Sequence, residues 1–242
     1  QYAKAIFGNT AEMLEFFSNK LGVQYAWQKY AQIVARDYVS GAMENTSATL
    51  HGDFVYQTDK ELIDGSRGED VISHELFHQW FGDLVTCESW SNLPLNESFA
   101  TYGEYLWEEY KYGLDAADDH SYDSRMGYMA EASQNPKTLI RFDVLNREDM
   151  FDGHSYNKGG QVLHMLRKYV GDDAFFASLK LYLEKNKYTS VEIHNLRLAF
   201  EETTGEDLNW FFNQWFLSQG HPDLNIQSTY DEATKKVKLN VK

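Results

Sequence analysis

The sequence predicts an α+β protein, with a small β-sheet region first and a mainly α-helical body after it. Residues 30–57 carry the short alternation of apolar and polar side chains that is typical of strands. From Gly68 to Gly220 the apolar residues recur at helical spacing, interrupted by glycine and proline. Strands and helices in separate runs favour α+β over an alternating α/β fold, and 242 residues suffice for one sizeable core.

Local signals place the individual elements. A helix is expected over residues 9–21, with Asn9 and Glu12 at the spacing of a capping box. Gly22 is expected to end that helix. Within the β region, strands are expected at residues 31–35 and 54–56. In the helical body, helices are expected at residues 69–81, 94–112, 115–133 and 156–170, and after the cap residues Asp172, Ser190 and Asp207.

The end of the chain has a different pattern. Residues 226–230 and 237–241 predict a β-hairpin after Pro222. We therefore expect one main domain over residues 1–221 and the first strands of a following, truncated β domain over residues 222–242. The chain begins at Gln1 with neither Met nor a signal sequence, which we interpret as a processed chain or an excised fragment.

Composition narrows the classes of partner. The net charge of −15 argues against nucleic acid and against an anionic membrane surface, because both repel an acidic protein. The charge suits cationic ligands such as peptides with a free amino terminus, although solubility alone can account for it. Cys87 is the single cysteine, so an internal disulfide is excluded and the compartment stays undecided. No apolar run of about 18 residues is present, so no membrane-spanning segment is expected.

The strongest chemical signal is the run His74-Glu75-Leu76-Phe77-His78. On a helix, positions i and i+4 share one face, so both imidazoles can reach one Zn²⁺. Glu75 lies one position further round, where it can miss the metal and reach the water bound to it. The alternative is a chance match on an ordinary helix. It is disfavoured because the flanks are apolar, and two histidines and a glutamate would be poor core residues without a metal.

A catalytic zinc needs a third protein ligand and an open position. Glu97 lies on the next expected helix, and the segment after His78 is long enough for that helix to return past the first. Thr101 and Glu104 share a helix face with Glu97 and are candidates to hydrogen-bond a ligand. Taken alone, Glu97 would be interpreted as a solvated helix glutamate.

Three segments together resemble a known family: Gly41–Asn45 (GAMEN), His74–Gly82 (HELFHQWFG) and Leu95–Tyr102 (LNESFATY). They are similar to the gluzincin zinc aminopeptidases, the family of aminopeptidase N and the leukotriene hydrolases, over about residues 25–221. The resemblance implies a thermolysin-like catalytic domain over residues 1–221 with one Zn²⁺ per chain. The implied ligands are His74, His78 and Glu97, with Glu75 as the general base.

The resemblance also implies how a peptide is held. Glu44 would bind the α-ammonium of a substrate with a free amino terminus, and its neighbours Gly41, Ala42, Met43 and Asn45 would complete that subsite. Tyr156 matches the catalytic tyrosine of the family, which donates a hydrogen bond to the oxyanion. Without the resemblance, the GAMEN segment would be interpreted as a turn beside an edge strand and Tyr156 as a packing residue.

Two departures from the family pattern are visible. Ser98 stands where the family usually has Gly, and Pro94 where it usually has Trp, which predicts a shifted pocket wall with activity retained. Family members usually carry a preceding β domain that contributes to the ammonium site. This chain lacks that domain, so the other domains of a longer protein are expected partners.

Other interpretations remain open. The same zinc site would suit an endopeptidase, a related hydrolase that also acts on a lipid epoxide, or a catalytically inactive peptide-binding homologue. Some residues show no ligand spacing and are expected to be ordinary polar or packing residues: His51, His120, His154, His164, His194 and His221. A solvated acidic face is expected at Asp115, Asp118, Asp119 and Asp123.

Overall fold

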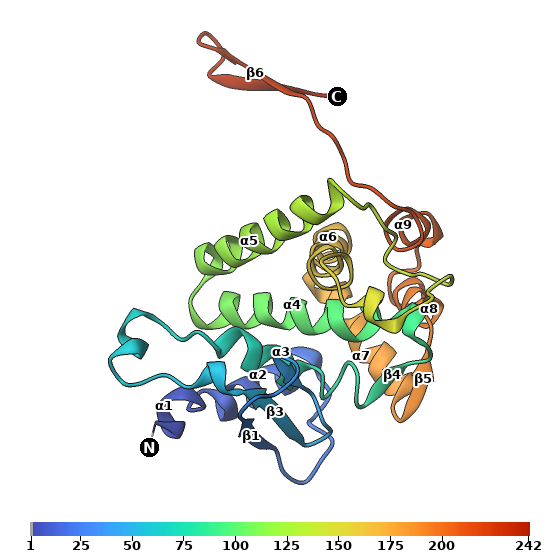
Figure 1. Ribbon diagram of the computed structural model, residues 1–242. Helices are drawn as coiled ribbons and strands as arrows, with labels where there is room; N and C mark the ends of the chain where they lie inside the picture. The colour runs from blue at the N-terminus through green and yellow to red at the C-terminus, as the bar shows by residue number, and fades with distance from the viewer. Residues whose placement is uncertain (1) are drawn as a thin grey trace.

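The computed structural model describes residues 2–242 and has the expected mixed α+β architecture (Figure 1). The first elements are α1 (Ala3–Ile6), α2 (Thr10–Leu21), β1 (Ala31–Ala35), β2 (Ala42–Met43) and β3 (Ala48–Gly52). The strands form a sheet of order β1–β3–β2, in which β3 is parallel to β1 and antiparallel to β2. Ala31 lies opposite Ala48, and Met43 lies opposite Leu50. The segment that contains Met43 is therefore fixed at one edge of this sheet.

The helical body is built around one long central helix. Its helices are α3 (Glu69–Phe77), α4 (Pro94–Lys111), α5 (Leu114–Ala132), α6 (Gly159–Val170), α7 (Asp172–Asn186), α8 (Ile193–Thr204) and α9 (Asn209–Trp215). Two short parallel strands, β4 (Val85–Cys87) and β5 (Thr189–Val191), lie beside α7 and α8. Figure 1 shows α4 between α3 on one side and α5 and α6 on the other. A single apolar cluster that includes Phe77, Phe99 and Trp107 holds these layers together.

The structure corrects several local predictions. Residues 53–55 form one turn of 3-10 helix, so the predicted strand at 54–56 is wrong, and the central strand β3 was not predicted. Asn9 lies at the N-cap position of α2 but its side chain makes no capping hydrogen bond, so the predicted capping box is absent; its amide nitrogen donates to Glu69 Oε1 over 2.9 Å. Helix α3 ends at Phe77, before the predicted residue 81. Ser190 lies in β5, and α8 is capped by Glu192 instead.

The predicted carboxy-terminal hairpin is confirmed as β6 (Ile226–Asp231) and β7 (Lys236–Val241), with Ile226 opposite Val241. All residues of both strands are exposed, and the hairpin extends away from the helical body (Figure 1). That it begins a further β domain stays a prediction. Over residues 2–242, no helix combines the length and the apolar character that crossing a membrane requires.

The middle strand β3 contains a fully buried histidine, His51. Its Nε2 lies 2.9 Å from the amide oxygen of Gln32, whose nitrogen donates to Thr10 Oγ1 over 2.7 Å. An amide oxygen only accepts, so Nε2 carries the proton, and Nδ1 has no partner among the described residues. Burial lowers the pKa of His51 to about 4. The folded protein therefore keeps this ring neutral.

This burial predicts a pH-dependent stability. In the unfolded chain His51 has a pKa of about 6.5, so the unfolded state binds a proton below that pH. In the folded state the ring binds a proton only near pH 4. His51 therefore does not affect stability above the unfolded pKa, lowers it progressively as the pH falls from about 6.5 to about 4, and lowers it no further below the folded pKa. We expect the free energy of unfolding to fall by about 2 kcal/mol between pH 7 and pH 5 because of protonation of His51 in the unfolded state. Urea unfolding at both pH values measures this loss.

His51→Gln is the informative variant, because it lacks the titrating group and should lose that much less stability on acidification. His194→Gln, at an exposed position, is the control and should behave as the wild type. Equal losses in the wild type and in His51→Gln would contradict the assignment.

Candidate metal centre

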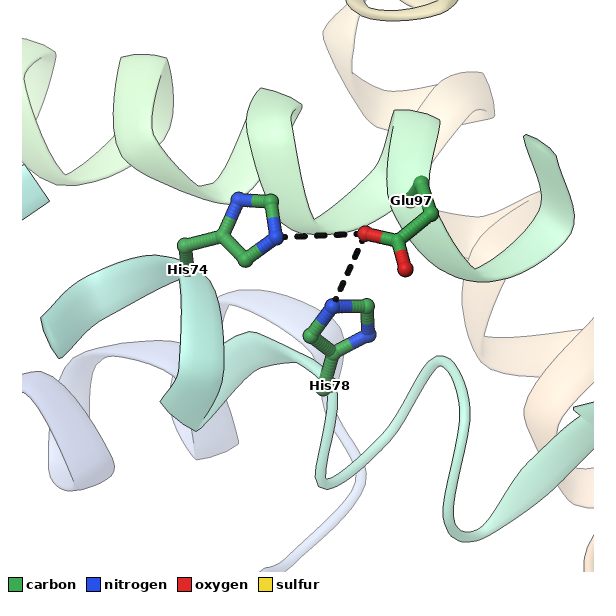
Figure 2. Close-up of side chains that lie close together, drawn as sticks. All are labelled: His74, His78 and Glu97. Carbon is green, nitrogen blue, oxygen red and sulfur yellow. Dashed lines mark hydrogen bonds and ion pairs between the residues drawn. The ribbon is translucent and has the colours of Figure 1, made fainter. Parts of the chain in front are cut away.

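Two helices bring the three predicted metal ligands together. His74 lies in the last turn of α3 with His78 directly after it, and Glu97 lies in the first turn of α4. Glu97 Oε2 is 3.3 Å from His74 Nε2 and 3.2 Å from His78 Nε2 (Figure 2). All three residues are buried, and their ligand atoms lie within 4.8 Å of one another. This cluster could hold a metal ion.

A glycine permits the close approach of the two helices. Gly103 on α4 faces Phe77 on α3, and a Cβ at position 103 would lie only 2.6 Å from Phe77 Cγ. Real Cβ atoms do not come so close, so only glycine fits at this helix crossing. The carboxylates on either side of Gly103 along α4, Glu97 and Glu104, can therefore reach across to α3.

The second nitrogen of each imidazole is held by an acceptor. His78 Nδ1 donates to the carbonyl oxygen of Phe81 over 2.9 Å, so Nδ1 keeps its proton. His74 Nδ1 lies 2.6 Å from Glu104 Oε1, which orients this ring in the same way. Both Nε2 atoms therefore face Glu97, and Nε2 is the nitrogen of each ring at which a metal ion would take the place of a proton.

The other candidate beside the ligands, Thr101, has a different environment. Within the described chain its hydroxyl makes no hydrogen bond to His74, His78 or Glu97, and its Cγ2 lies against Gly160 at the start of α6. Thr101 therefore spaces α4 from α6, whereas Glu104 contacts the cluster.

The electrostatics of the cluster follow from buried groups of opposite charge. Burial by itself would raise the pKa of Glu97, but the charges and hydrogen bonds of His78 and His74 hold it well below its usual range. Burial would lower the pKa of His78, but the charges of Glu44 and Glu97 raise it to about 9. The cluster therefore attracts a cation, whether a proton or a metal ion.

Glu75 is buried next to this cluster, with 6% of its surface exposed. Its Oε2 has no hydrogen-bond partner among the described residues, and its side chain lines the cavity in front of the cluster. Burial raises the pKa of Glu75 to about 7, against the lowering effect of His74 and His78. A carboxylate with a free oxygen and a pKa near neutrality can accept and return a proton.

The GAMEN segment forms another side of the cavity, and Gln79 holds it in place. Gln79 is fully buried; its amide nitrogen donates to the carbonyl oxygen of Glu44 over 2.9 Å, and its amide oxygen accepts from the Ser47 N–H over 2.8 Å. Glu44 offers a carboxylate oxygen within 4.8 Å of ligand atoms of Glu75 and His78. The sequence analysis missed Gln79, although its position directly after His78 is a usable signal.

The predicted subsite is only partly assembled at the cavity. Gly41, Ala42, Met43 and Glu44 line it. Asn45 does not line it, and its carbonyl oxygen accepts the Ala48 N–H over 2.8 Å in the turn that leads into β3. Asn45 therefore shapes the turn behind the subsite.

Tyr156 lies on a single π-helical turn, η5 (His154–Lys158), at the start of α6. Its ring stacks on His74, with centroids 5.9 Å apart and planes 16° apart. Burial raises the pKa of the phenol, and the negative charge of Glu97 raises it further. The hydroxyl is therefore a permanent hydrogen-bond donor beside the cluster.

Side chains from three other segments fix η5. Asp152 Oδ1 accepts the N–H groups of His154 and Ser155 over 3.1 and 3.0 Å, and Glu131 Oε2 accepts the Gly153 N–H over 2.7 Å. Ser98 on α4 donates to the carbonyl oxygen of Ser155 over 2.7 Å. Neither Ser98 nor Pro94 lines the cavity, so the expected shift of the pocket wall stays a prediction; Ser98 connects α4 to η5.

Glu131, Asp152 and His154 also offer three ligand atoms within 4.8 Å of one another. The side-chain nitrogen and oxygen atoms of these residues already form hydrogen bonds and ion pairs within the protein. Asp152 pairs with both guanidinium nitrogens of Arg141 over 2.7 and 2.8 Å, and His154 joins Glu131 over 2.9 Å. His154 Nε2 accepts the Lys137 N–H over 3.1 Å. This second group is therefore part of the support of η5.

The cavity that contains these groups has a volume of about 770 Å³. His74, Glu75, His78, Glu97 and Tyr156 form its inner wall. Its outer walls carry large apolar side chains, Met43, Trp90 and Phe151, each of which is partly exposed. This combination of a few convergent polar groups and apolar walls is typical of a small-molecule or peptide site.

The sequence of this chain is similar to those of known peptidases. Residues 6–215 match the Peptidase family M1 domain. Aminopeptidase N of Streptomyces lividans is 35% identical over 227 residues, which cover 90% of this chain and 26% of that protein. Aminopeptidase M1-A of Oryza sativa subsp. japonica is 33% identical over 227 residues, which cover 88% of this chain and 25% of that protein. The chain thus spans about a quarter of the length of these curated relatives.

The fold is also similar to that of solved peptidase structures. The crystal structure of the M1 zinc metallopeptidase from Deinococcus radiodurans superposes with a TM-score of 0.72 at 28% identity, covering 89% of this chain and 45% of that one. Legionella pneumophila aminopeptidase A in complex with aspartic acid superposes with a TM-score of 0.77 at 21% identity, covering 100% of this chain and 27% of that one. At that lower identity the second match supports the fold alone.

The helix crossing at Gly103 generates a prediction. Gly103→Ala places a methyl group against Phe77 and should lower the free energy of unfolding by about 1–3 kcal/mol, the usual cost of overpacking. Urea denaturation measures the change. Gly127→Ala, in the interior of α5, is the matched control, because its Cβ would meet only the mobile amide end of Asn157. The control should be neutral or stabilising, and equal losses in both variants would contradict the packing argument.

Proposed function

Because the chain belongs to peptidase family M1, we propose that it provides the catalytic metal centre of a zinc aminopeptidase, with a thermolysin-like arrangement of its helical body. The observation that carries the proposal is the convergence of His74 Nε2, His78 Nε2 and Glu97 Oε2 at one buried point. We also propose that residues 222–242 begin a separate β domain, and that further domains complete the substrate site.

The donor set suits zinc. Two imidazole nitrogens and one carboxylate oxygen form one of the usual ligand sets of catalytic zinc, and the cavity in front of them leaves a side open for water or substrate. The acceptors on His74 Nδ1 and His78 Nδ1 direct both Nε2 atoms at Glu97, where a bound metal ion would replace any proton on Nε2. Zinc bound there would supply Lewis acidity and lower the pKa of its water to about 7.

Glu75 is proposed as the general base. Its unpartnered oxygen lines the cavity, and its raised pKa suits proton transfer near neutral pH. In the proposed reaction Glu75 accepts a proton from the attacking water. It then delivers that proton to the nitrogen of the leaving amine.

Tyr156 is proposed as the oxyanion donor. Its phenol stays protonated because burial and the charge of Glu97 both raise its pKa. The stacking on His74 and the bonds around η5 fix its position before substrate arrives, which is the condition for efficient stabilisation of a developing negative charge.

Glu44 is proposed to select the free amino terminus. It lies at the mouth of the site, in a segment held by Gln79, and can form a charge-assisted hydrogen bond with an ammonium group. A peptide held there by its first residue presents its first peptide bond to Glu75. This positioning distinguishes an aminopeptidase from an endopeptidase with the same metal centre.

The role of Glu75 is tested by Glu75→Gln. We expect the variant to bind zinc as the wild type does but to hydrolyse an aminoacyl-arylamide at least about 10³-fold more slowly, since the amide cannot accept the proton. Metal analysis and turnover on the same preparation check both parts. Glu184→Gln, on the exposed face of α7, should leave both unchanged. Near-normal turnover in Glu75→Gln would remove its proposed role.

The role of Glu44 is tested by Glu44→Gln. We expect KM for a substrate with a free amino terminus to rise roughly 10- to 100-fold with a smaller change in kcat, because a charge-assisted hydrogen bond to the ground state is lost. Steady-state kinetics on matched free and amino-acetylated substrates make the comparison. If the wild type cleaves both substrates equally well, an endopeptidase is the better description. Bound zinc without hydrolysis of either substrate would favour an inactive peptide-binding homologue.

A further inference from the structure

A further histidine lies behind the carboxylate that orients His74. His120 on α5 places its Nε2 3.0 Å from Glu104 Oε2, while the other oxygen of Glu104 is 2.6 Å from His74 Nδ1. One continuous chain of side chains therefore runs from α5 through α4 to α3. From the sequence His120 is expected to be an ordinary polar residue, and the structure places it against Glu104.

We propose that His120 is a positioning residue for the metal centre: by holding Oε2 of Glu104 it keeps Oε1 directed at His74 Nδ1. This inference rests on the proposed function, because it concerns the affinity of His74 and its partners for zinc. His120 touches neither substrate nor metal in this scheme. It acts only through the orientation of Glu104.

The surroundings of Glu104 explain why it needs a second partner. Its side chain is 15% exposed, and within the described chain only His74 and His120 hydrogen-bond its carboxylate. Without His120, Oε2 would be left largely buried and unpaired, which favours rotation of the carboxylate toward solvent. Such a rotation also moves Oε1 away from His74.

An open groove beside Glu104 leaves space into which its carboxylate could rotate. The volume of the groove is about 400 Å³, and it is lined by Glu104 and His120 together with Asp70, Thr101, Asp123, Ser124, Tyr156 and Asn157. Water in this groove would compete with His74 for the carboxylate of Glu104. His120 lines the groove beside Glu104, with 25% of its side chain exposed. It therefore closes the hydrogen-bond chain on the solvent side.

The charge around His120 favours its role as donor. The hydrogen bond to Glu104 raises the pKa of His120, and the negative charges of Asp70 and Glu108 act in the same direction. A positively charged ring donates a stronger hydrogen bond than a neutral one. The pKa of Asp70 is raised first by burial and then by the charge of Glu104, and a proton on His120 would offset that repulsion.

The test measures zinc affinity in addition to activity. Metal-free wild type, His120→Ala and His120→Gln are titrated with Zn²⁺ against a chromophoric chelator. We expect His120→Ala to weaken zinc binding about tenfold, the lower end of the range for groups that orient a metal-bound imidazole. His120→Gln should recover most of that loss, because its amide can still donate to Glu104.

His164→Ala is the matched control. His164 is also half-buried and hydrogen-bonded, but to the Tyr102 hydroxyl over 3.2 Å. The zinc affinity of the His164→Ala variant should equal that of the wild type. Circular dichroism of each metal-free variant shows whether the fold is intact before zinc is added.

Two results would overturn the inference while the proposed function stands: zinc affinity of His120→Ala equal to that of His164→Ala, or no recovery in His120→Gln with both variants folded. A wild-type chain that does not bind zinc would instead overturn the proposed function, and the inference with it.

Discussion

The close contact between α3 and α4 is the constraint on which the site depends. The zinc ligands proposed here come from both helices, so a wider crossing would separate Glu97 from the two histidines. Gly103 allows the contact, and the apolar side chains around Phe77 maintain it. The same crossing brings Glu104 to His74. One helix contact therefore positions both the proposed zinc ligands and the carboxylate that orients His74. The burial of these polar groups is tolerated because almost every one of them has a partner. One exception among the described residues is Glu75 Oε2, which lines the cavity where a reacting water would lie.

Local sequence signals located most of the helices and identified candidate ligands that the structure brings together. The spacing of His74 and His78 depends only on the helical repeat, Glu97 followed from the need for a third ligand on the next helix, and the family resemblance supplied Glu44 and Tyr156. The mixed α+β class was predicted correctly for a similar reason, since it follows from periodicity within short windows. Strand β3 was missed because Ala48–Gly52 has little apolar alternation of its own and becomes a strand by pairing with β1 and β2.

The unpredicted residues share one property: their roles depend on contacts between segments far apart in the sequence. Gln79 contacts the GAMEN turn 35 residues away, and Ser98 contacts η5 57 residues away. His120 reaches Glu104 only because α5 folds back along α4 (Figure 1). No pattern within a helix indicates such a partner, so a polar residue on an amphipathic helix is indistinguishable from a solvated one until the helices are packed.

The position of Tyr156 shows how far this dependence extends. A π-helical turn is rarely stable by itself, because it opens the normal hydrogen-bond ladder of a helix. Here η5 is held by Asp152, Glu131 and Ser98, and Asp152 is held in turn by Arg141. The hydrogen bonds that support η5 are thus distinct from those that support His74, and the two groups of residues meet where the Tyr156 ring stacks on His74. Loss of a group behind η5 should therefore alter turnover more than zinc affinity, whereas loss of a group behind His74 should alter zinc affinity first.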